Sequence, residues 1–262
     1  LLSSTFHLGH PERAWRALSQ WRSSWLSREG VMAFATYLPT GLFAAGWVFF
    51  GRTDGPFAWL GFAAALLCIA TVYCTAMIYA SLKSVPRWSN PWVVSVYLAL
   101  ALATGALLLT LLVRLFGHEP VLTDPLALLW LFVAAAAKSA YWRSIRIRPA
   151  QSTASSATGL GNPGRVRLLD APHTEANYLM QEMGYQIARK HADRLRLIAF
   201  ALLFAVPVVL LLSAVAIAGN AGPTILIGLA ALSAGAGVLV ERWLFFAEAK
   251  HVVTLYYGER MA

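Results

Sequence analysis

The chain has 262 residues, of which 58% are apolar and only 13% are charged. Because soluble domains average about 25% charged and about 45–50% apolar residues, this composition excludes a soluble enzyme and indicates an integral membrane protein. The formal net charge of +9 is therefore interpreted first as a signal of membrane orientation, and no nucleic-acid partner is expected.

An amphipathic segment precedes the first long apolar stretch. Within 12–26, Ala14, Leu18, Trp21 and Trp25 follow one another at helical spacing, with arginines around the rest of the helix. A basic helix with an apolar face lies in the plane of the membrane interface. We therefore predict that 1–30 form an interfacial segment.

Six stretches are long and apolar enough to cross a bilayer core of about 30 Å, which takes about 20 residues. The sequence predicts an all-α polytopic transmembrane bundle, organised as one membrane-anchor domain over 1–262. Pro39 and Pro207 fall inside two spans, where neighbouring groups can satisfy the freed carbonyls. The last span is rich in small residues and is expected to sit centrally. The predicted spans are 31–50, 57–82, 92–116, 121–142, 197–219 and 224–247.

The basic residues are distributed very unevenly between the two sides of these spans. The side that holds the N-terminus carries seventeen of the 21 lysines and arginines, whereas the other side carries only Arg52 and Arg114. Because cytoplasmic loops are enriched in Lys and Arg, the first side is predicted to be cytoplasmic. The 1–30 segment and a long basic loop over 143–196 then lie in the cytoplasm.

The long loop has two parts. Its portion 151–164 is rich in Ser, Ala, Thr and Gly and is predicted to be a flexible loop. Its portion 173–196 is predicted to form an amphipathic helix that leads into the fifth span. That helix either lies on the lipid headgroups or docks a cytoplasmic partner.

Ionisable residues at the cytoplasmic end of the spans are candidates for function, because such groups are costly at membrane depth. Each also has a structural explanation. Glu29 suits the positive end of a helix dipole, and Lys138 can reach the interface along its own stem. Glu241 and Arg242 project in different directions and need not pair with each other. His7 ends an apolar stretch and can serve as a hydrogen-bonded structural residue.

No nucleotide-binding or hydrolase motif occurs, so no catalytic residue is assigned. No metal site is expected, because two cysteines cannot supply a four-thiolate iron–sulfur cluster. A haem is not expected either, because none of the six histidines lies in the middle of a span.

Two motifs carry a family resemblance. The run His-Leu-Gly-His-Pro-Glu-Arg-Ala-Trp at 7–15, followed by Ser-Trp-Leu-Ser-Arg-Glu at 24–29, resembles a signature of the membrane-anchor subunits of the dimethyl sulfoxide reductase type. Ile78-Tyr79 with 85–88, and 242–246 in the last span, agree further. Members of this family have eight helices without haem, which implies that two helices preceding Leu1 are missing from this chain.

The resemblance implies a quinone site, for ubiquinone or menaquinone, formed by His7, Gly9, Arg13, Trp15 and Glu29. A histidine that donates to a quinone carbonyl and a carboxylate that relays protons suit this chemistry. The resemblance also implies a bacterial inner membrane, with partners on its cytoplasmic face: a molybdopterin catalytic subunit and a ferredoxin-like iron–sulfur subunit, which hold the metal cofactors. Lipids are further expected partners. Candidates for proton relay or for support of the site are Lys138, Glu241 and Arg242.

The predicted cytoplasmic position of the histidine motif favours one branch of the family. Dimethyl sulfoxide reductases of the best-known kind have their catalytic arm outside the cytoplasm, whereas this sequence is more similar to the anchors of cytoplasm-facing sulfite:quinone oxidoreductases. The expected function is transfer of electrons from sulfite oxidation to the quinone pool. Two alternatives remain open: the anchor of a reductase that oxidises menaquinol, and a small transporter, for which inverted repeats would be expected.

Overall fold

The computed structural model describes residues 9–147, 152–159, 166, 169–170, 185–217, 219 and 221–257. All elements in these ranges are helices, and six of them are long and apolar enough to cross a membrane. The predicted all-α fold with six spans is confirmed. The chain divides into two compact units, Leu1–Ser81 and Leu82–Ala262, which are described separately. The expectation of one domain over 1–262 stays a prediction.

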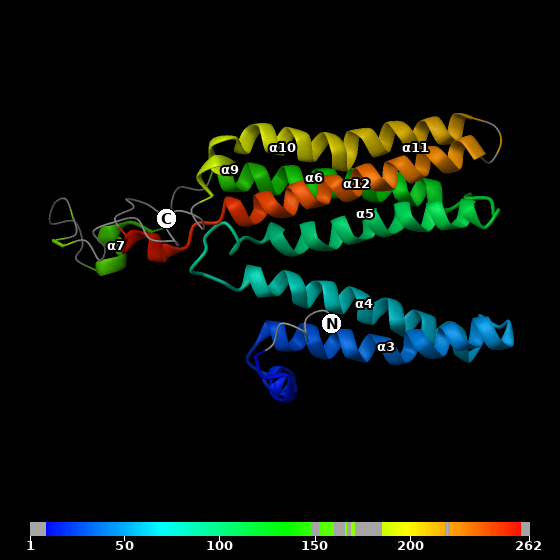
Figure 1. The fold of residues 1–262 in the computed structure, drawn as a ribbon, viewed down its shortest axis with the longest axis horizontal. Helices are drawn as coiled ribbons and strands as arrows, with labels where there is room; N and C mark the ends of the chain where they lie inside the picture. Colours follow the sequence, from blue (N-terminus) through cyan, green and yellow to red (C-terminus); the bar gives the residue numbers. More distant parts are fainter. Residues whose placement is uncertain are drawn as a thin grey trace. The chain divides into compact units, whose positions relative to one another are not determined.

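The first unit is built on an antiparallel pair of helices, α3 (Trp25–Phe50) and α4 (Pro56–Ala80) (Figure 1). Helix α3 begins six residues before the predicted span, because the Ser24 hydroxyl accepts a hydrogen bond from the Ser27 amide and caps the helix. It ends at Gly51, whose φ of 62° is the left-handed conformation that favours glycine.

The segment before α3 differs from its prediction. In place of one amphipathic helix over 12–26, the structure has a single 3-10 turn, η1 (Pro11–Arg13), and a short helix, α2 (Arg16–Ser19). The chain then leaves helical geometry at Ser24, which is extended in order to cap α3. The cap of α3 therefore interrupts the helical pattern that Trp21 and Trp25 would otherwise continue.

Four spans form the second unit (Figure 1): α5 (Trp92–Leu115), α6 (Thr123–Ile147), the run α10 (Ala192–Phe200), η2 (Ala201–Ala205) and α11 (Val206–Ala216), and α12 (Ala221–Ala247). Helix α12 packs against α5, α10, η2 and α11, so the small-residue helix is central in this unit, as predicted. The end of α6, the start of α10 and the end of α12 lie together at one end of the unit.

The predicted loop over 143–196 is partly helical where the structure describes it. Helix α6 continues to Ile147, a short helix, α7 (Ala154–Thr158), lies within the segment predicted to be flexible, and the fifth span already begins at Ala192. The predicted amphipathic helix is represented by α9 (Gln186–Lys190) and the start of α10, whereas 173–184 lie outside the described residues. A final 3-10 turn, η3 (Val252–Leu255), follows α12.

A proline and a serine explain the irregular turn in the fifth span. The π-helical turn η2 directly precedes α11, whose second residue, Pro207, has no backbone N–H to donate. In π-helical geometry residue 207 would donate to the Leu202 carbonyl, five residues earlier. The Ser233 hydroxyl of α12 donates to that carbonyl instead, at 2.8 Å. This contact agrees with the expectation that neighbouring groups can satisfy the carbonyls freed by the prolines.

The same region requires a glycine. A Cβ atom on Gly237 would lie 2.6 Å from the Leu203 backbone nitrogen, whereas one on Gly235 would meet nothing within 4 Å. We therefore expect Gly237→Ala to lower the free energy of unfolding by about 1–3 kcal/mol through overpacking. Gly235→Ala is the matched control on the same helix. Equal thermal stability of the two purified variants would contradict this close approach.

Candidate functional site

A buried ionic cluster of Lys138, Glu241 and Arg242 joins α6 to α12 in the second unit. The Lys138 ammonium hydrogen bonds to Glu241 Oε1, and both residues are only 1% exposed. The Arg242 guanidinium donates to both oxygens of the same carboxylate, at 2.5 and 2.8 Å. Glu241 and Arg242 therefore do pair with each other, and Lys138 pairs inside the protein instead of extending to the interface.

This cluster lies well inside the span. Glu241 comes six residues before Ala247, the last residue of α12, which corresponds to about 9 Å along the helix. The single Glu241 carboxylate is the counter-ion of both Lys138 and Arg242, and both of its oxygens accept hydrogen bonds from these cations. Aromatic faces support the surplus positive charge: Lys138 lies 4.3 Å from the Tyr141 ring centroid, and Arg242 lies 4.3 Å from that of Tyr97.

A second set of charges surrounds the end of α12. Glu248 forms ion pairs with Arg87, at 3.4 Å, and with Arg196. Arg189 donates to the carbonyls of Ala247 and Ala249, at 2.8 and 3.0 Å, and so places a cation where a helix leaves carbonyls unsatisfied. These partners of Glu248 and of the end of α12 come from separate segments of the chain, and the sequence carried no sign of their contacts.

Trp88 fixes the chain between α4 and α5 against the same helix end. Its ring stacks on Phe245 with centroids 5.6 Å apart, and its Nε1 donates to the Phe245 carbonyl at 3.1 Å. Both residues belong to motifs that the sequence singled out. Their contact gives these motifs a structural role in the second unit.

In the first unit, Glu29 is the predicted site residue with a partner on another helix. The Thr75 hydroxyl of α4 donates to Glu29 Oε1 at 2.7 Å. Nearby on α3, the Arg28 guanidinium lies 4.1 Å from the Trp25 ring centroid, and Trp25 contacts Tyr73 edge to face. Glu29 is thus a half-buried carboxylate in a part of the first unit that also holds two aromatic rings.

The other predicted quinone-site residues have no such contacts where they are described. Gly9 is exposed, and a Cβ added there would meet nothing within 4 Å. Arg13 is exposed, 3.7 Å from the carboxylate of the neighbouring Glu12, and Trp15 is 64% exposed. His7 lies outside the described residues. The predicted site therefore comprises one carboxylate with a partner on a neighbouring helix, Glu29, and an open N-terminal surface.

The described residues contain no group of three or more His, Cys, Asp or Glu side chains that could hold a metal ion. The described residues form a multi-pass membrane protein with a buried ionic cluster inside two of its spans, a second set of charges at the end of α12, and a carboxylate near aromatic rings. It belongs to the class of helical multi-pass membrane proteins.

Comparison with known proteins identifies the family. The family model of the DMSO reductase anchor subunit (DmsC) matches residues 1–258. The chain is also 33% identical over 269 residues to a sulfite dehydrogenase subunit of Allochromatium vinosum, covering 97% of this chain and 80% of that protein. No solved structure matches the chain. The chain belongs to the DMSO reductase anchor subunit family, as its motifs predicted.

Membership of this family defines the role in general terms. The protein is a membrane-anchor subunit of a molybdoenzyme complex, whose other members are catalytic and iron–sulfur subunits. The transporter alternative has no support from this family.

Proposed function

We propose that this chain anchors a sulfite-oxidising molybdoenzyme to the cytoplasmic face of a bacterial inner membrane and passes its electrons to quinone. The observation that carries the proposal is the 33% identity, over nearly the whole chain, to a subunit of a sulfite dehydrogenase. The excess of basic residues on one side supports the cytoplasmic position of the 1–30 segment and the long loop.

The proposed site uses the 1–30 segment together with Glu29. Sulfite takes up one water molecule and becomes sulfate, and it releases two electrons and two protons. A quinone bound at this site takes up two electrons and two protons and becomes quinol, so the two half-reactions balance. His7 donates a hydrogen bond to a carbonyl oxygen, and Glu29 exchanges protons with the cytoplasm. Thr75 positions the Glu29 carboxylate. Gly9, Arg13 and Trp15 line the approach.

The buried ionic cluster has a supporting role in this proposal. Lys138 and Arg242 share the one Glu241 carboxylate, so the cluster fixes α6 against α12 inside the span, about two turns from the end of α12 that faces the partners. Molybdopterin and the iron–sulfur clusters belong to the partner subunits, which dock on this side.

The substitution Glu29→Gln tests whether Glu29 transfers protons without removing its contact with Thr75. The glutamine oxygen can still accept the Thr75 hydrogen bond, but the side chain cannot carry a proton. We expect quinone-coupled turnover to fall about 100-fold, the size of a general acid–base contribution, with unchanged thermal stability. Glu12→Gln, on the exposed N-terminal surface, is the control. Full activity of Glu29→Gln in a quinone-reduction assay would remove Glu29 from proton transfer.

The subunits that co-purify with the tagged chain test the proposed function. We expect a molybdopterin protein without a twin-arginine export signal, together with a ferredoxin-like iron–sulfur protein. The second candidate, the anchor of a reductase that oxidises menaquinol, is favoured by the description of the matching family. A catalytic subunit that carries a twin-arginine signal would support that candidate and contradict a cytoplasm-facing enzyme.

A further inference from the structure

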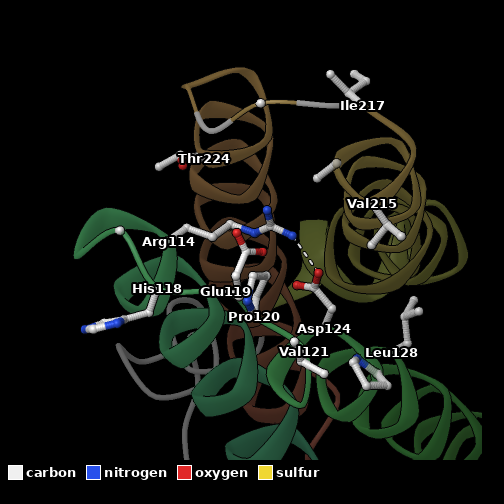
Figure 2. Close-up of a pocket in the computed structure, with 14 residues that line it drawn as sticks. Arg114, His118, Glu119, Pro120, Val121, Asp124, Leu128, Val215, Ile217 and Thr224 are labelled. Carbon is white, nitrogen blue, oxygen red and sulfur yellow. Dashed lines mark hydrogen bonds and ion pairs between the residues drawn. The ribbon is translucent and has the colours of Figure 1, made fainter.

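Figure 2 shows a pocket of about 560 Å³ in the second unit. It lies where α5 ends and α6 begins, at the opposite end of the unit from the end of α12 (Figure 1). The end of α5, the start of α6 and the end of α11 contribute its walls. Its chemistry comes from two basic and two acidic residues with apolar side chains beside them, namely Arg114, His118, Glu119, Asp124, Leu128 and Val215.

Arg114 and Asp124 form the polar wall of this pocket. Arg114 Nη2 donates to Asp124 Oδ2 at 2.5 Å, and the two side chains are 11% and 13% exposed. Arg114 Nε and Asp124 Oδ1 are also buried, and neither has a hydrogen-bond partner in the described part of the chain. Protein atoms cover both of these atoms, so an occupant of the pocket meets the accessible edge of the ion pair, where a cation and an anion lie side by side. This wall favours an occupant that brings both an acceptor and a donor.

The pocket lies at the depth of lipid headgroups. Arg114 is in the last turn of α5, and Asp124 is in the first turn of α6, so both sit where spanning helices meet water. Apolar side chains beside the pocket are strongly exposed: Val121 is 75% exposed and Val215 is 57% exposed. The acyl chains of a lipid would cover these apolar side chains, whereas a free water-soluble headgroup would leave them exposed.

We propose that this pocket binds the zwitterionic headgroup of an aminophospholipid, of the phosphatidylethanolamine type. The phosphate accepts hydrogen bonds from the Arg114 guanidinium, and the primary ammonium donates to the carboxylates of Asp124 and Glu119. A guanidinium beside two carboxylates matches a headgroup that carries both charges. Phosphatidylglycerol has no ammonium, and the trimethylammonium of phosphatidylcholine has no N–H to donate.

Native mass spectrometry of the delipidated, purified complex tests this proposal. The complex is supplied in turn with dioleoyl phosphatidylethanolamine, phosphatidylcholine, phosphatidylglycerol or free phosphoethanolamine. The expected result is retention of phosphatidylethanolamine about tenfold stronger than that of the other two lipids, since a charge-assisted hydrogen bond contributes that much. Glu119→Gln should abolish the preference. Asp54→Asn, an exposed carboxylate in the connection between α3 and α4, should leave it intact.

Each contrary result overturns the proposal. Equal retention of the three lipids, or an unchanged preference in Glu119→Gln, would remove the ammonium contact. Displacement of the lipid by free phosphoethanolamine at equal concentration would show that a soluble headgroup is the occupant. Both variants change exposed residues, so neither should lower the thermal stability of the complex. A loss of lipid preference at unchanged thermal stability is therefore a loss of binding and not of folding.

Discussion

Glu241→Gln is expected to lower the free energy of unfolding by about 3–5 kcal/mol, because it leaves two buried cations without their shared carboxylate. Lys138→Met is expected to cost much less, about 1 kcal/mol, since Glu241 and Arg242 then remain as a neutral pair. The asymmetry follows from the ratio of one anion to two cations. It distinguishes this cluster from a simple Lys–Glu bridge, in which either change would be equally harmful.

Unfolding of the purified chain in mixed detergent and sodium dodecyl sulfate measures these differences. Glu12→Gln is the control, because its exposed ion pairs contribute little to stability. If Lys138→Met proves as destabilising as Glu241→Gln, then Arg242 does not share the carboxylate as described.

Replacement of His7 by alanine is expected to lower quinone-coupled sulfite oxidation at least about 100-fold, the lower end of the general acid–base range. Alanine removes both the hydrogen bond to the carbonyl oxygen and the proton that accompanies reduction. Sulfite oxidation measured with a soluble dye should be unchanged, because the dye takes electrons from the partner subunits.

His10→Ala is the matched control for His7. It lies three residues further on and contacts Glu12 at 3.0 Å on the exposed surface, so it should keep full quinone turnover. Loss of dye-coupled activity in His7→Ala would instead assign His7 to docking of the partners, and unchanged quinone turnover would exclude it from the site.

The fold was predicted from the lengths of the apolar stretches in the sequence. All six spans follow from them, since a bilayer requires about 20 apolar residues whatever the packing. The residues at which the helices begin and end were less predictable. Ser24 extends α3 toward the N-terminus by capping it, and α10 begins at Ala192, among charged residues that pair with each other. Such caps and pairs depend on local geometry that hydropathy does not register.

The contacts of the candidate residues could not be predicted in the same way. Lys138 and Glu241 are separated by 103 residues in sequence, and nothing in either helix specifies the other as its partner. Adjacent residues on a helix diverge, so pairing of Glu241 with Arg242 was not expected, yet the long guanidinium stem reaches the carboxylate. Glu29 was identified by its motif, whereas its partner Thr75 carried no signal.

Reduction of quinone by the purified complex with sulfite as the electron donor tests the central claim most directly. We predict that one quinol and one sulfate form together without added dye, and that the reaction fails when this chain is removed from the complex. Absence of sulfite-dependent quinone reduction, together with menaquinol-dependent reduction of dimethyl sulfoxide by the same complex, would contradict the proposed function.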